Sequence, residues 1–240
     1  MMNKPVLTLF FVTVLGIISF LILTYTRPSQ AYEDLEEQFN IYLANDLTSD
    51  AKFIDYMNDL TLMHASENVT ISYEIDQVNV NQSGVIVGID GINVYVLSYN
   101  HEAFNDNDID INIIDFKNRI KSAEIIKTDG QYDVVLLRFR TFDVSELTTV
   151  KYADLIPIEN EFISSISNYN GISSYVMLGI FKETISEGYY ALDMQASQTV
   201  LGSSVYNANH EIIGIRVLNN DDIVILSIEM IKEFIESSLV

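Results

Sequence analysis

From residue 68 onward the chain consists of a long succession of short strand-like segments. Apolar residues first alternate with polar ones at Val69, Ile71 and Tyr73, and a period of two is typical of strands with one buried face. Further strand-like runs occupy residues 85–89, 94–98, 111–114, 123–127, 134–139, 162–166, 175–181, 189–194, 203–206, 212–217 and 223–227. Turn pairs such as Asp90-Gly91 separate them. This pattern predicts an all-β sandwich or barrel, because alternating α/β folds need longer helical segments between strands.

Segments with helical periodicity flank the β-rich region. Between residues 31 and 66, apolar residues such as Leu35 and Phe39 recur at spacings of three and four, which predicts a helical stalk. The chain ends with an amphipathic run over residues 229–239, where Met230 and Phe234 share one face. We therefore expect a C-terminal helix after the last strand.

Residues 6–25 form an apolar run without charge, long enough to cross the hydrocarbon core of a bilayer. We predict a transmembrane anchor, because the run exceeds the roughly 7–15 apolar residues of a signal peptide. A cleaved signal peptide is the alternative, since Ser29 and Ala31 have the small-residue spacing of a cleavage site. With the short N-terminus inside, either version places residues 32–240 outside the cytoplasm. The expected location is the cell membrane, with a single pass and an extracytoplasmic C-terminal domain.

The charge of the chain limits its partners. The 34 Asp and Glu residues outnumber the 13 Lys and Arg residues, for a formal net charge of −21. This excludes nucleic acid as a ligand, because phosphate binding requires basic patches. The chain has no Cys, which excludes disulfides, thiolate metal sites and cysteine nucleophiles. His64, His101 and His210 are a weak basis for structural zinc, so we expect no metal and no small-molecule cofactor.

Three motifs follow one another along the β-rich region. Ser83-Gly84-Val85 precedes a strand that ends in Ser98-Tyr99-Asn100-His101, and Asp133 opens the apolar run Val134–Leu137. The third motif runs from Asp193 to Asn207 and is followed by Glu211-Ile212-Ile213-Gly214-Ile215. In order and spacing, these motifs resemble those of trypsin-like serine proteases of the HtrA/DegP and glutamyl-endopeptidase type. The resemblance covers about residues 67–232.

The resemblance implies a double β-barrel and a Ser-His-Asp triad, in which His activates Ser and Asp holds the tautomer of His. His101 falls on the family His, and Asp133 falls on the family Asp. Counting back from Glu211 without a gap places the family nucleophile on Leu201. The same count continues to Asp193, which matches an Asp of the family pattern.

Leucine has no hydroxyl group and cannot form an acyl-enzyme. The family also has Gly two residues before the nucleophile, where its N–H contributes to the oxyanion hole. Here that position is Thr199, so Thr199 and Gly202 belong to a degenerate oxyanion loop. These losses predict a pseudoprotease in which His101 and Asp133 are relics. In the alternative reading, a register shift makes Ser203 or Ser204 the nucleophile of an active endopeptidase.

The expected organisation is a membrane anchor or signal peptide over residues 1–30, a helical stalk over 31–66, and a trypsin-like double barrel with a C-terminal helix over 67–240. A protease scaffold without its nucleophile keeps its cleft and surface loops. We therefore expect an inactive domain, held at the membrane by residues 6–25, that serves as a protein-binding, regulatory or structural subunit of a membrane complex. Its expected partners are proteins, and the alternative is a serine endopeptidase that uses Ser203 or Ser204 with His101 and Asp133.

Overall fold

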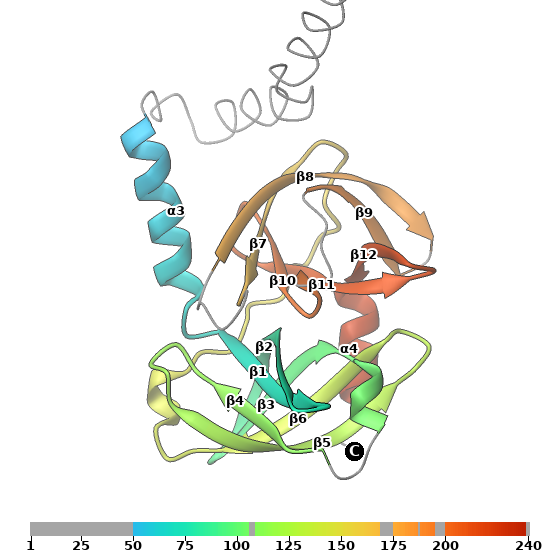
Figure 1. Cartoon of the computed structure of the whole chain (residues 1–240). Coiled ribbons are helices and arrows are strands. Elements are labelled where there is room, and N and C mark those ends of the chain that lie inside the picture. The colour runs from blue at the N-terminus through green and yellow to red at the C-terminus, as the bar shows by residue number, and fades with distance from the viewer. Residues whose placement is uncertain (1–49, 106–108, 169–174, 187, 195–199, 239–240) are drawn as a thin grey trace, which may run out of the picture. The chain divides into compact units, whose positions relative to one another are not determined.

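The computed structural model describes residues 50–105, 109–168, 175–186, 188–194 and 200–238 (Figure 1). The predicted membrane segment, most of the predicted stalk and Thr199 lie outside these residues. Within the described residues, no helix has both the length and the apolar character needed to cross a membrane. The predicted anchor therefore stays a prediction.

The first barrel is built from the strands between residues 68 and 140. They are β1 (Asn68–Ile75), β2 (Val78–Asp90), β3 (Asn93–Tyr99), β4 (Ile111–Ile114), β5 (Ile120–Asp129) and β6 (Val134–Arg140). The strands are antiparallel in the order β1-β2-β3-β6-β5-β4, and β4 pairs with β1 to close the barrel. Inward-facing residues such as Ile71, Val96 and Leu137 are fully buried, as the alternating pattern predicts.

The second barrel has the same topology. Its strands are β7 (Phe162–Ser167), β8 (Tyr175–Ser186), β9 (Tyr189–Asp193), β10 (Ser204–Asn207), β11 (Ile212–Asn219) and β12 (Asp222–Ser227). β9 pairs with β12, and β10 pairs with β7, so the closed order β7-β8-β9-β12-β11-β10 repeats that of the first barrel. The two barrels repeat the same order of strand pairing. Strand pairing depends on the alternation of apolar and polar residues and on the turns, so the two barrels do not need similar sequences.

Two-residue turns set the register of hairpins in both barrels. Asp76 and Gln77 connect β1 to β2, while Asn220 and Asp221 connect β11 to β12, and all four have positive φ angles between 50° and 71°. Positive φ at both central positions is the geometry of type I′ turns, which match the twist of antiparallel strands. Three of the four are Asp or Asn, the non-glycine residues that best tolerate this region.

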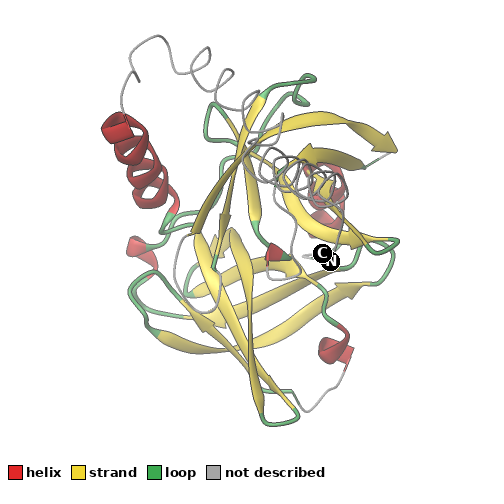
Figure 2. Cartoon of the chain, turned by 45° about the horizontal axis from the view of Figure 1, so that its top comes forward, coloured by secondary structure: helices red, strands yellow, loops and turns green. Residues whose placement is uncertain are grey.

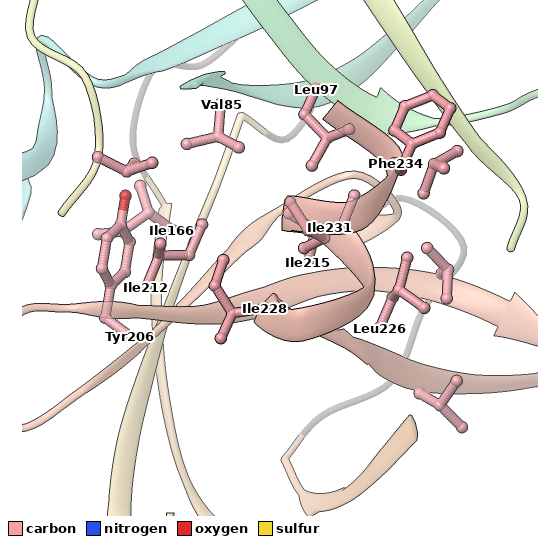
Figure 3. Packing of buried hydrophobic residues seen from close by; sticks show 14 of the residues in the cluster. Val85, Leu97, Ile166, Tyr206, Ile212, Ile215, Leu226, Ile228, Ile231 and Phe234 are labelled. Atoms are coloured by element: carbon pink, nitrogen blue, oxygen red, sulfur yellow. The ribbon is translucent and has the colours of Figure 1, made fainter. Parts of the chain in front are cut away.

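Helices pack on the outside of the barrels and between them (Figures 1 and 2). The chain enters the first barrel from α3 (Asp50–His64) and leaves the second barrel into α4 (Ile228–Glu236). Figure 3 shows Ile228 and Ile231 of α4 in one apolar cluster with Leu97 of the first barrel and Ile215 of the second. The predicted C-terminal helix is confirmed, and its apolar face joins the barrels.

This packing predicts the effect of shortening one side chain of α4. Ile231 is fully buried in the cluster, so Ile231→Val is expected to lower the free energy of unfolding by about 1 kcal/mol through loss of one buried methyl group. Urea denaturation of the full chain measures the change. Ile158→Val is the matched control, because Ile158 is 74% exposed. Equal losses in the two variants would contradict the packing role of α4.

Candidate functional site

The backbones at His101 and Asp133 lie close together because β3 pairs with β6. Tyr99 pairs with Val134, and just beyond them the N–H of Asn100 donates to the carbonyl oxygen of Asp133 at 2.7 Å. The backbone therefore brings these two positions to the same edge of the first barrel. This is the arrangement that the resemblance implies.

The side chain of His101 is held within its own segment. Its Nδ1 accepts a hydrogen bond from the N–H of Ala103 at 3.1 Å, at the start of a short 3-10 helix over Glu102–Asn105. Its ring centre lies 5.6 Å from that of Tyr73. An Nδ1 that accepts cannot also carry a proton for Asp133, so the neutral ring has its proton on Nε2.

Asp133 has different neighbours. Within the described part of the chain, no hydrogen bond joins its carboxylate to His101, whereas in the triad that the resemblance implies, the Asp holds the His. Burial raises the pKa of Asp133, and the nearby Asp129 raises it further. The charge of Asp133 also contributes to the raised pKa values of Tyr99 and Tyr189, after burial, which is the larger cause in both. Asp133 thus faces tyrosines and another acid.

Leu201 lies on a tight turn between β9 and β10. The N–H of Ser203 donates to the carbonyl oxygen of Val200 at 3.1 Å, so Leu201 and Gly202 are the central residues. Gly202 has φ +77°, which the second central position of a type II turn requires. Leu201 is buried.

This turn packs directly against the first barrel. A Cβ added at Gly202 would lie well under 3.0 Å from the carbonyl oxygen of Ser83 and from Oγ of Ser98. Ser98 itself donates to the Ser83 carbonyl at 2.5 Å. Because Ser98 is three residues before His101 on the same segment, the structure brings the turn of Leu201 beside the segment that ends in His101.

The alternative nucleophiles are both buried at the start of β10. Ser203 and Ser204 are fully buried. Oγ of Ser203 lies 3.2 Å from Oγ of Ser165, and Oγ of Ser204 donates to Oδ1 of Asn68 at 2.7 Å. These hydroxyl groups have partners other than His101.

Sequence reasoning missed Arg216 of β11. Its N–H donates to the carbonyl oxygen of Ser203 at 3.0 Å, and its own carbonyl accepts from Gly202 at 2.8 Å. The side chain is 2% exposed, its guanidinium group contacts the sulfur of Met194, and burial lowers its pKa to about 10. An arginine in the apolar run Ile212–Leu218 was the available signal, since arginine is seldom fully buried.

The comparison with known proteins identifies the fold. The sequence matches no described protein family and no curated protein. The structure is similar to the crystal structure of the serine endoprotease from Yersinia pestis, with a TM-score of 0.64 and 20% identity over 76% of this chain and 66% of that chain. The fold is that of a trypsin-like serine protease. The predicted double barrel is thereby confirmed, and at this identity the likeness shows the fold alone.

Proposed function

We propose that this protein is a catalytically inactive trypsin/HtrA-like domain that acts by binding other proteins. The observation that carries the proposal is the position of Leu201, on the turn that packs beside the His101 segment. A trypsin-like mechanism requires a hydroxyl group there to attack the peptide carbonyl. Leucine supplies none, and loss of the nucleophile alone costs several orders of magnitude in rate.

The state of His101 supports the proposal independently. A general base in this fold carries a proton on Nδ1 and presents the lone pair of Nε2 to the nucleophile. Nδ1 of His101 instead accepts from Ala103, and the carboxylate of Asp133 does not bond to it. Thr199, in place of the oxyanion-hole glycine, adds a third departure that rests on the sequence.

The setting of the domain supports a binding role at a membrane. We propose that residues 6–25 anchor the chain and that the barrels face outward as a protein-binding, regulatory or structural subunit of a membrane complex. All 34 acids lie beyond residue 32, so the field around the domain favours a partner with a basic surface.

A fluorophosphonate probe tests the proposal, because it labels only an activated serine. The full chain is expected to remain unlabelled, with an active trypsin-like protease as the positive control. Labelling that disappears in Ser203→Ala or Ser204→Ala would overturn the proposal in favour of an active endopeptidase. Capture of protein partners from detergent-solubilised membranes, compared with a chain that lacks residues 6–25, then tests the binding role.

A further inference from the structure

A cluster of buried polar side chains lies where α3 meets the second barrel, apart from the trypsin-like site. His64, the last residue of α3, is 1% exposed. Its Nδ1 lies 2.7 Å from Oε2 of Glu67, and its ring stacks on that of Tyr206 with 3.9 Å between centres. The hydroxyl group of Tyr206 donates to the same carboxylate oxygen at 3.1 Å. One carboxylate therefore holds both the histidine and the tyrosine.

Asn68 completes the connection between the helix and β10. Its Nδ2 contacts the carbonyl oxygen of His64 at 2.9 Å and the hydroxyl oxygen of Tyr206 at 3.1 Å. Its Oδ1 accepts from Ser204. Leu60, one turn earlier in α3, is buried in the same apolar cluster as Tyr206, whereas Leu62 is 75% exposed. The end of α3 is thus docked through Leu60 and His64.

A second histidine faces the first. His210 lies on the turn between β10 and β11, and its ring centre is 5.6 Å from that of His64. Nε2 of His64 and Nδ1 of His210 are buried without a hydrogen-bond partner in the described part of the chain. Burial lowers the pKa of His210, the charge of His64 lowers it further, and Glu67 opposes the shift.

Few negatively charged groups lie near His64 and His210 to neutralise a proton bound by either ring. Glu67 is the carboxylate that acts on both rings, and Tyr206 is a titratable group in contact with the ring of His64. Glu211, next to His210 on the turn, is bound to Lys151 at 2.5 Å. Among the described residues, no three His, Asp or Glu side chains gather as metal ligands.

We propose that His64, Glu67 and His210 form an acid-sensitive latch that holds the end of α3 on the second barrel and releases it at low pH. Protonation of the His210 ring adds a positive charge beside the ring of His64, whose Nδ1 is already within 2.7 Å of the one carboxylate of the cluster. Because the pKa of His210 is lowered in the docked form, the released form binds that proton more readily. Docking is therefore complete above the ordinary histidine pKa of about 6.5 and weakens as the pH falls below it.

The expected consequence of releasing α3 is a longer connection between the predicted membrane segment and the barrels. In the sequence, α3 lies between the predicted membrane segment and the barrels, so its release would let the domain move farther from its point of attachment. This inference rests on the cluster, and it holds whether or not the trypsin-like site is active.

The cysteine-free sequence allows a direct test on the full chain. Leu62→Cys on α3 and Glu183→Cys on β8 are exposed positions, and spin labels attached to them report the distance between helix and barrel. At about pH 7.5 we expect one narrow distance distribution, and at about pH 5, below the histidine pKa, loss of that peak in favour of longer distances. The same sample returned to the higher pH is expected to recover the narrow peak.

Two histidine variants test whether His210 causes the release of α3 at low pH. His210→Asn is neutral at both pH values, and asparagine tolerates the left-handed backbone of this position, where φ is 62°. It is expected to keep the narrow distribution at low pH, whereas the control His101→Asn loses it like the parent. If His210→Asn does not fold by circular dichroism, His210→Gly replaces it, since glycine also accepts this φ. A parent that is unchanged at low pH, or a His210 variant that releases α3 like the parent, would overturn the proposal.

Discussion

Restoring the missing hydroxyl group in a Leu201→Ser, Thr199→Gly variant is expected to leave the chain unreactive toward a fluorophosphonate probe. The new serine would still lack a base. Nδ1 of His101 accepts the N–H of Ala103 at 3.1 Å, which leaves the ring proton on Nε2, where the lone pair for the serine proton must be. A triad with the wrong histidine tautomer loses about 10⁴-fold in rate, so we expect the labelling rate constant to fall short of an active trypsin-like protease by at least that factor.

Two measurements separate this explanation from a simple failure to fold. The variant should retain the circular dichroism of the parent. Nitrogen-15 NMR of the imidazole rings identifies the tautomer of His101 directly, with His64 and His210 resolved by His→Asn variants. Labelling of the double variant at the rate of an active protease, or a proton found on Nδ1 of His101, would contradict the explanation from the histidine tautomer.

The strands were predictable because burial on one face imposes alternation. The run at 111–114 coincides with β4, and the runs at 85–89 and 134–139 lie within β2 and β6. The outer part of β8 was missed, because residues 183–186 are exposed and no buried face imposes a period on them. Ser203 was placed in a strand but belongs to the turn, since its N–H bonds to Val200.

The side-chain partners could not be predicted. The resemblance to trypsin-like proteases implied that His101 and Asp133 lie near one another, and their backbones meet at one edge of the first barrel. The hydrogen bond from Ala103 instead depends on the local backbone of a short helix. The His64 cluster was missed for a related reason. Its members come from two segments far apart in the sequence, residues 64–68 and 204–210, and polar contacts of this kind have no period. Sequence patterns thus indicate which backbone segments meet, and geometry decides which atoms bond.

Gly202→Ala is expected to lower the free energy of unfolding by about 2–4 kcal/mol, measured by urea denaturation of the full chain. A methyl group there meets the backbone oxygen of Ser83 and Oγ of Ser98 at separations that real Cβ atoms essentially never show. Relieving such overpacking costs about 1–3 kcal/mol. The positive φ adds about 1 kcal/mol, because a residue with a Cβ is strained in this conformation.

Two other glycines separate these causes. Gly130 has open space and no positive φ, so Gly130→Ala is expected to be neutral or slightly stabilising. Gly91 also has open space but a φ of 59°, so Gly91→Ala is expected to cost only the conformational part, about 1 kcal/mol. The excess for Gly202 over Gly91 therefore measures the contact between the turn of Leu201 and the segment that leads to His101. Equal losses of unfolding free energy at the two positions would mean that this turn does not pack against the first barrel. The assignment of Leu201 to the position of the nucleophile would then be wrong.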